Sequence, residues 1–268
     1  MRLDDVRGFV LDVDGTLVHR AGDHVHVLPG AKEALSRIRA SGRPLALFTN
    51  GSHIPPEGFA AGLREAGLGV SDAELLTPLS SVQTYLRSRQ CSTLLLFGTA
   101  DARGYLLANG IRVADGNERD DVDAVFVAHT DVVDFEELER AARAILGGAR
   151  LLTGSFVPAY AGANGPIFSR GAMLTAALAK ATGARPVVVG KPSRAALRTI
   201  EEHLGAGTQE LAVIGDDLDL DVALGRLGGS RTILVRSGIS GGVQVEQLPA
   251  RRRPDAVVDG IADLLEWL

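Results

Sequence analysis

Apolar runs of strand length alternate with helix-like segments along almost the whole chain. The strand-like runs fall at 8–13, 45–48, 94–97, 124–128, 186–189, 211–214, 232–235 and 256–258. Segments with helical periodicity follow them at 31–40, 57–66, 80–89, 135–146, 172–181, 194–204 and 222–227. Such alternation is typical of parallel sheets covered by helices, in which functional loops follow the carboxyl ends of the strands. The sequence therefore predicts an α/β fold with a Rossmann-like parallel sheet.

The first predicted strand ends in two acids, Asp12 and Asp14, which stand one residue apart and precede Gly15. Side chains alternate across a regular strand, but a turn at Gly15 lets the backbone bend so that both carboxylates address one pocket. Such a pair suits a nucleophile for phosphorus together with an acid and base that serves the leaving oxygen and then water. The pattern alone is also compatible with a capped turn that carries two solvated acids.

Two further strand ends carry groups that suit a phosphoryl ligand. The second strand is followed by Thr49, Asn50, Gly51 and Ser52. Their hydroxyl and amide groups can donate to phosphate oxygens, although such a run is also an ordinary polar turn. Lys191 follows a later strand in a Gly-Lys-Pro-Ser run, where its ammonium can neutralise the nucleophile and the phosphoryl charge. The alternative interpretation is a surface lysine at a strand end.

Four acids follow the strand at 211–214, namely Asp216, Asp217, Asp219 and Asp221. Mg²⁺ prefers one or two protein carboxylates together with waters and substrate phosphate, which suits Asp216 acting with the acids of the first strand. A calcium loop of the EF-hand type does not fit this segment. Val222 stands where the turn glycine is needed, and Gly228 stands where the bidentate glutamate is needed. The acids therefore favour a magnesium site.

Composition and charge exclude several classes of function. The 268 residues are 46% hydrophobic, which is enough for a proper core in one or two domains. The net charge of -5 gives no electrostatic reason to expect nucleic acid, and the basic run at 251–253 has no aromatic residue interleaved with it. We find no targeting segment and no apolar run that approaches the roughly 20 residues of a membrane span. We therefore expect a cytoplasmic protein with no nucleic-acid or membrane partner.

Taken in order, four motifs resemble those of the haloacid dehalogenase (HAD) superfamily. They are Asp-x-Asp-Gly-Thr-Leu, Thr-Asn-Gly-Ser, Gly-Lys-Pro-Ser and Gly-Asp-(four residues)-Asp, and each stands at the end of a predicted strand. The acid at Asp14 favours the phosphatase branch, because the dehalogenases and P-type pumps lack it. The resemblance implies a Mg²⁺-dependent phosphatase that hydrolyses small phosphate monoesters through an aspartyl-phosphate intermediate.

The resemblance also implies a chemical role for individual residues. Asp12 would be the nucleophile, and Asp14 would be the general acid and base. The phosphoryl group would be held by residues of the second and third motifs, namely Thr49, Asn50, Gly51 and Lys191. These assignments place the whole reaction at the carboxyl edge of one sheet.

The same resemblance implies a set of metal ligands. They would be the Asp12 carboxylate, the Asp14 backbone carbonyl and the Asp216 carboxylate. Asp221 would support them by orienting Lys191 or a bound water. The resemblance implies no role for Asp217 and Asp219.

The long interval between Ser52 and Lys191 has its own alternation of strands and helices, and a C2-type cap would be inserted there. We expect a core at 1–91 and 185–268 and a smaller α/β cap at 92–184. This layout is similar to subfamily IIA, the p-nitrophenyl phosphatase and pyridoxal phosphatase group. A closing cap would exclude water and select the leaving group of a small phosphorylated metabolite. Caps of this group often dimerise, so we also expect a homodimer through the cap.

The cap region departs from its group in one loop. Members often carry an acidic residue and a Pro-Gly pair in the strand-to-helix loop, whereas this chain reads Thr-Gly-Ser-Phe-Val-Pro-Ala-Tyr at 153–160 and Gly-Pro-Ile-Phe at 165–168. His129, Tyr160 and Asn164 could reach a substrate, but a lone histidine after a strand is more often structural.

Two other functions remain compatible with the motifs. A phosphotransferase or mutase would use the same residues and pass the phosphoryl group to a hydroxyl instead of water. A non-catalytic module that binds a phosphate ligand is disfavoured, because every charged group that the chemistry requires is present. A receiver-type signalling domain does not fit, because its phosphorylated aspartate ends the third strand.

Overall fold

The computed structural model describes residues 2–21, 24–115, 121–162 and 165–268 and divides into two compact units. Unit 1 comprises Met1–Thr49, Pro56–Leu76 and Lys191–Leu268, and unit 2 comprises Asn50–Pro55 and Thr77–Gly190. Both are built from parallel sheets and helices, which confirms the predicted α/β class. Within the described ranges, no helix combines the length and the apolar character needed to cross a membrane.

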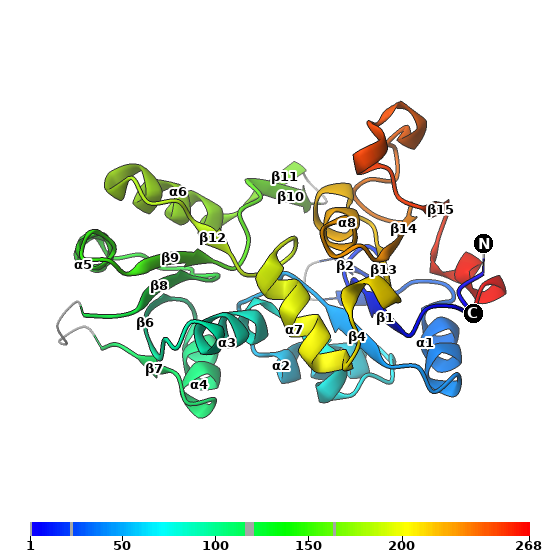
Figure 1. Cartoon of the computed structure of the whole chain (residues 1–268), viewed down its shortest axis with the longest axis horizontal. Coiled ribbons are helices and arrows are strands. Elements are labelled where there is room, and N and C mark those ends of the chain that lie inside the picture. Colours follow the sequence, from blue (N-terminus) through cyan, green and yellow to red (C-terminus); the bar gives the residue numbers. More distant parts are fainter. Residues whose placement is uncertain (1, 22–23, 116–120, 163–164) are drawn as a thin grey trace. The chain divides into compact units, whose positions relative to one another are not determined.

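Unit 1 contains a six-stranded parallel sheet in the order β15-β14-β13-β1-β4-β5 (Figure 1). Its strands are β1 (Gly8–Leu11), β4 (Leu45–Phe48), β5 (Leu75–Leu76), β13 (Leu211–Gly215), β14 (Arg231–Val235) and β15 (Ala256–Val258). All four residues of β1 are buried, and the strand pairs with β13 on one side and β4 on the other. Strands buried on both faces have continuous apolar sequences, which explains why the runs were recognisable.

Helices of unit 1 cover this sheet. They are α1 (Ala31–Ala40), α2 (Pro56–Glu65), α7 (Arg194–Leu204) and α8 (Ala223–Gly228), with a π-helical turn at Leu218–Val222 and short 3-10 turns at Asp72–Glu74, Thr208–Glu210, Val245–Gln247, Ala250–Arg252 and Ile261–Glu266. The Ser193 side chain caps α7, and Leu197 and Ile200 of that helix pack with Val10 and Val213 of the sheet. The last turn, whose Leu264 is fully buried, packs against α1.

A hairpin that the sequence pattern did not predict follows the first strand. It consists of β2 (Val18–Ala21) and β3 (His24–Val27), which pair antiparallel with His19 opposite His26. The segment Val18–Ala21 shows no alternation of apolar and polar residues. The segment His24–Val27 does alternate, but over only four residues, so it is a weak signal for a strand. The hairpin matters because it brings Arg20 to the site described below.

Unit 2 contains a five-stranded parallel sheet in the order β12-β9-β8-β6-β7. Its elements are β6 (Thr93–Phe97), β7 (Arg112–Val113), β8 (Ala124–Val127), β9 (Arg150–Thr153), β12 (Val187–Val188), the hairpin of β10 (Ala159–Gly162) and β11 (Gly165–Phe168), and helices α3 (Pro78–Ser88), α4 (Ala100–Ala108), α5 (Phe135–Leu146) and α6 (Arg170–Thr182). Figure 1 shows the sheet between α5 and α6 on one side and α3 and α4 on the other. Val125 and Leu151 pack with Ile145 and Leu178 on the first side.

The compact unit is larger than the insertion expected at 92–184. Helix α3 falls within it. Strand β12 does so too, because Val187 and Val188 pair with β9 and extend the same sheet. Thr77 caps α3 with its side chain and is the first residue of the longer segment of unit 2. The boundaries between the two units therefore lie closer to the second and third motifs than the expected boundaries at 92 and 184 do.

One hydrogen-bond arrangement recurs at the start of paired strands in both sheets. In unit 2, the Thr93 backbone N–H and hydroxyl donate to Asp123 Oδ2 at 2.9 and 2.8 Å, and the Asp123 N–H donates back to Thr93 Oγ1 at 3.0 Å. In unit 1, Thr232 and Asp255 form the same reciprocal pair at 2.8, 2.9 and 3.0 Å. Each aspartate thus ties together the beginnings of two adjacent parallel strands.

We expect Asp123→Ala to lower the free energy of unfolding of unit 2 by about 2–3 kcal/mol, because hydrogen bonds to a charged acceptor contribute this much. The carboxylate also accepts from the Ser92 N–H at 2.8 Å, and this bond and those from Thr93 lower its pKa. Urea unfolding followed by circular dichroism measures the loss. Asp121→Ala, which removes an exposed acid two residues away, is the matched control. Equal stabilities of the two variants would contradict the prediction.

Candidate active site

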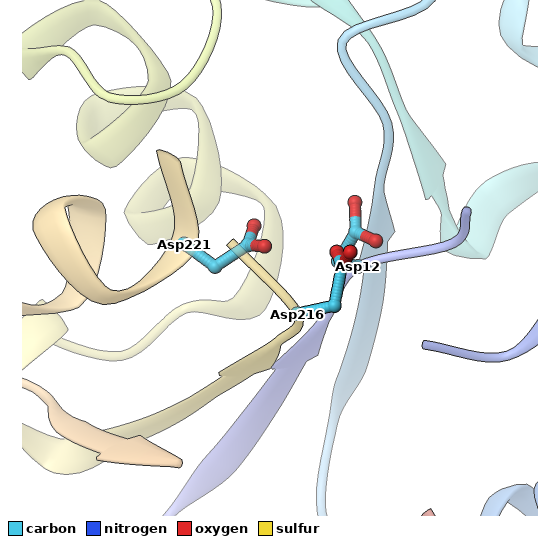
Figure 2. Close-up of side chains that lie close together, drawn as sticks. All are labelled: Asp12, Asp216 and Asp221. Atoms are coloured by element: carbon cyan, nitrogen blue, oxygen red, sulfur yellow. The ribbon is translucent and has the colours of Figure 1, made fainter. Parts of the chain in front are cut away.

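The site of unit 1 is assembled from the carboxyl ends of adjacent strands. Asp12 follows β1 and Asp216 follows β13, and these strands pair in register with Leu11 opposite Ile214. The Asp12 N–H continues the ladder by donating to the Ile214 carbonyl at 2.9 Å. The two carboxylates therefore lie at the same edge of the sheet, and Asp221 approaches them from the π-helical turn (Figure 2). Thr49 follows β4, on the other side of β1.

The Lys191 ammonium joins two of these acids. Its Nζ donates to Asp12 Oδ1 at 2.6 Å and to Asp221 Oδ1 at 2.7 Å, and its side chain is 2% exposed. Nζ also lies 5.7 Å from the centroid of the Phe48 ring. Burial acts to lower the pKa of Lys191, but the Asp12 and Asp221 carboxylates outweigh it and raise that pKa above its ordinary value. The lysine is therefore a permanent cation at the centre of the cluster.

Asp12 has one engaged and one unengaged oxygen. Oδ1 accepts from Lys191, whereas buried Oδ2 has no hydrogen-bond partner among the described residues. Burial raises the pKa of Asp12 well above its usual range, and the Lys191 ammonium opposes this shift. A buried carboxylate oxygen without a partner is costly, so Oδ2 is the oxygen of Asp12 that is available to an electrophile or a cation.

The three acids form a group that could hold a metal ion. One carboxylate oxygen from each of Asp12, Asp216 and Asp221 lies within 4.8 Å of the others. Burial, followed by repulsion from Asp221, raises the pKa of Asp216 to about 6. Both oxygens of Asp221 already accept hydrogen bonds, from Lys191 and from the Asp217 N–H at 3.2 Å. Asp12 and Asp216 are therefore the better candidates for direct ligands of a hard cation.

Three glycines make room for these carboxylates. A Cβ atom would lie 2.4 Å from Asp216 Oδ2 at Gly15, 1.9 Å from the same atom at Gly238, and 2.1 Å from Asp221 Cγ at Gly215. The φ angle of +87° at Gly15 also favours glycine. The sequence indicated Gly15 as a turn residue, but no pattern distinguished Gly238 in its loop.

Asp14 and Thr49 lie against each other beside this cluster. The Thr49 hydroxyl donates to Asp14 Oδ2 at 3.4 Å, and Arg20 Nε donates to Asp14 Oδ1 at 2.5 Å. The Asp14 side chain is 43% exposed, unlike the buried acids. Arg20 is a site residue that the sequence did not indicate, because its approach to Asp14 depends on the hairpin of β2 and β3.

The two acids without an expected role serve the local structure. Asp217 Oδ1 accepts from the backbone N–H groups of Asp219 and Leu220 at 2.7 and 3.2 Å and so begins the π-helical turn. Asp219 forms an ion pair with Arg252. The basic run at 251–253 is thus partly engaged in contacts within unit 1.

The remaining candidates belong to unit 2 and are described apart from this cluster. They include Asn50 and Gly51, which directly follow Thr49 in the chain. The His129 N–H donates to Ser52 Oγ at 3.0 Å, and the His129 ring packs edge-on against His53 at 5.7 Å between centroids. Asn164 lies outside the described residues, as does the side chain of Tyr160.

Comparison with known proteins finds matches over most of the chain. A model described as haloacid dehalogenase-like hydrolase matches residues 9–112, and a HAD-hydrolase-like model matches residues 188–264. The chain is 30% identical over 264 residues to the ribonucleotide monophosphatase NagD of Escherichia coli strain K12, covering 97% of this chain and 98% of that protein. The chain belongs to the haloacid dehalogenase-like hydrolase family. The resemblance carried by the four motifs is therefore confirmed.

Other members of this HAD family extend the similarity. The dihydroxyacetone phosphatase of Corynebacterium glutamicum strain R is 29% identical over 263 residues, covering 96% of this chain and 90% of that protein. The solved structure of p-nitrophenyl phosphatase from Archaeoglobus fulgidus superposes with a TM-score of 0.86 at 28% identity, covering 98% of this chain and all of that one. This HAD hydrolase is a phosphatase of the subfamily IIA type, as the sequence predicted.

In the absence of metal at pH 7.5, we expect Asp216→Asn to stabilise unit 1. The pKa of Asp216 is raised from 3.8 to about 6, so between these values the folded state keeps a proton that the unfolded state releases. The free energy of unfolding therefore falls as the pH rises through this window, by on the order of 2–3 kcal/mol in total. Thermal unfolding at pH 7.5 and pH 4 measures the effect. The prediction is contradicted if the variant is less stable than the native protein at pH 7.5, or if its stability differs from the native value by the same amount at both pH values.

Proposed function

We propose that this HAD phosphatase is Mg²⁺-dependent and hydrolyses small-molecule phosphate monoesters through an aspartyl-phosphate on Asp12. One observation carries the proposal. Asp12 is buried at the end of the central strand, with Oδ1 held by Lys191 and Oδ2 without a hydrogen-bond partner in the described part of the chain. A carboxylate held in this way is oriented for attack by its second oxygen.

The residues present fit a magnesium ion. The Asp12 and Asp216 carboxylates and the Asp14 backbone carbonyl would hold it, with Asp221 supporting through Lys191. Three carboxylates and one ammonium carry two excess negative charges when all are ionised, and a divalent cation balances them. When bound, Mg²⁺ supplies positive charge that neutralises the phosphoryl oxygens.

The chemistry then divides between two aspartates. An Asp12 oxygen attacks phosphorus, the bond from phosphorus to the leaving oxygen breaks, and the leaving oxygen keeps the electron pair and takes a proton from Asp14. In the second step Asp14 takes a proton from water while the water oxygen attacks phosphorus. The bond between Asp12 and phosphorus breaks, and its electron pair returns to the carboxylate.

Other residues hold the transferred group. Lys191, whose raised pKa keeps it charged, offsets negative charge on the phosphoryl oxygens. The Thr49 hydroxyl, together with groups of Asn50 and Gly51, would donate hydrogen bonds to these oxygens. Such fixed donors stabilise the transition state because they need no reorganisation during the reaction.

We further propose that unit 2 acts as the C2-type cap, which selects the leaving group. Its insertion between the second and third motifs supports this role. The named substrates of the relatives, a triose phosphate and ribonucleotides, guide the choice of esters to test. A cytoplasmic location and the absence of a nucleic-acid partner stay predictions.

We expect Asp12→Asn to lose phosphate release by at least about 10³-fold, because the amide cannot act as the nucleophile. The measurement is phosphate release from triose, glycerol, nucleotide and p-nitrophenyl esters, with Mg²⁺ and with chelator. Acid-quenched native enzyme should retain covalent phosphate that the variant lacks. Asp219→Asn, which alters only the ion pair with Arg252, should keep native activity.

The same experiment separates the other functions. If phosphate passes to an added sugar alcohol in preference to water, the protein is a phosphotransferase or mutase. If the folded native protein binds phosphate but releases none from any ester, it is a binding module. Release that survives Asp12→Asn or chelator would contradict the proposed mechanism.

A homodimer through the cap remains a proposal that the surface of unit 2 supports. Val132, which precedes α5, and Phe135, its first residue, are each 80% exposed, and Phe168 is 64% exposed at the end of β11. Large apolar side chains exposed close together in the chain, as at Val132 and Phe135, favour an interaction site there. A second copy of the chain would cover them.

Sedimentation of the whole chain should therefore give the mass of a dimer. Replacing Val132 and Phe135 together by Asp should shift the protein to a monomer, because charges in an apolar interface are costly. Leu227→Asp, at an exposed leucine of unit 1, is the matched control and should remain dimeric. A monomer mass for the native protein would overturn the proposal.

A further inference from the structure

Arg20 makes a contact that the chemistry above does not use. Its guanidinium reaches from the unpredicted hairpin to Asp14, the proposed general acid and base. We propose that Arg20 is a positioning residue, which fixes the direction in which the Asp14 carboxyl group exchanges its proton with the leaving oxygen. This inference rests on the proposed function of Asp14.

Asp14 needs such a partner because burial does not hold it. Its side chain is 43% exposed, whereas Asp12, Asp216 and Asp221 are buried. Arg20 Nε holds Oδ1 at 2.5 Å, and the Thr49 hydroxyl holds Oδ2 at 3.4 Å. The arginine contact is much the shorter and is charge-assisted, so it carries most of the constraint.

Arg20 is itself held from two directions. Its Cζ lies 5.9 Å from the centroid of the Phe59 ring, which is 4% exposed in α2. The neighbouring residue anchors the strand, because a His19 ring nitrogen and the Ser237 carbonyl lie 2.7 Å apart. The Ser237 hydroxyl in turn donates to the Gly15 carbonyl at 2.7 Å, beside Asp14. The hairpin therefore ties the arginine to the same turn that carries its partner.

A positioning role predicts a dependence on the leaving group. An alkyl ester needs a proton on its leaving oxygen, whereas p-nitrophenolate leaves without one. The value of kcat/KM covers the steps up to transfer of the phosphoryl group to Asp12, so it reports this proton transfer. Misplacing the acid by about 1 Å can cost on the order of 10²-fold.

The test compares kcat/KM for glycerol phosphate and p-nitrophenyl phosphate in Arg20→Met and Arg20→Lys. We expect Arg20→Met to lose roughly 10- to 100-fold on glycerol phosphate, mainly in kcat, and less than about 3-fold on p-nitrophenyl phosphate. Arg20→Lys, which keeps the charge, should recover part of the loss on glycerol phosphate. Arg64→Met is the matched control, because Arg64 has similar exposure and forms its ion pair, at 2.7 Å, with Asp72, which has no proposed role in the reaction.

Three results would overturn the proposal. They are an equal loss on both esters, a rise in KM alone, which would make Arg20 a substrate-binding residue, and a loss that Arg64→Met reproduces. Thermal unfolding of each variant separates loss of fold from loss of function. If Asp12→Asn remains active, the proposed function fails. If Asp12→Asn is inactive but Arg20→Met lowers kcat/KM by the same factor on both esters, only the proposed role of Arg20 fails.

Discussion

The buried ammonium of Lys191 is the interaction on which the site depends. It donates to Asp12 and Asp221 at 2.6 and 2.7 Å, so one cation holds together acids from a strand end and a helical turn that are distant in sequence. Without it, three buried carboxylates would repel one another at full strength. The lysine therefore makes the cluster possible, and it also leaves Asp12 with a single unengaged oxygen.

One ammonium cannot balance three carboxylates, and the backbone around them shows how closely they are confined. Gly15 and Gly238 both lie where a Cβ atom would meet Asp216, and the Ile239 N–H donates to the same carboxylate at 2.7 Å. These contacts hold the Asp216 carboxylate in a position where its pKa is raised to about 6, which lowers the free energy of unfolding. Proteins retain such destabilised groups where function requires them, and a divalent cation would relieve this one.

Much of the site could be predicted because parallel strands bring their carboxyl ends to one edge. The register of β1 with β13 and β4 brings Asp12, Asp216 and Thr49 to that edge, as the order of the motifs indicated. Arg20 could not be predicted in the same way. Its contact with Asp14 depends on the pairing of two short strands, and the one that carries Arg20, Val18–Ala21, has no alternation to detect. Gly238 was missed for a similar reason, since a loop glycine gives no signal until its neighbour is known.

The chain passes from unit 1 into unit 2, and later back into unit 1, next to site residues. Thr49 and Lys191 are the last and first residues of unit 1 at two of these crossings, and Asn50 and Gly190 stand on the other side of them. Within unit 2, a Cβ atom at Gly190 would lie 2.6 Å from Asn50 Oδ1. The two residues of unit 2 that adjoin these crossings therefore pack closely against each other. On the unit 1 side, the Thr49 N–H donates to the Leu76 carbonyl at 3.2 Å, and Lys191 forms its ion pairs with Asp12 and Asp221. The acids and the lysine that holds them all belong to unit 1, so a change in the sequence of unit 2, as at 153–160, leaves the ion pairs among them intact.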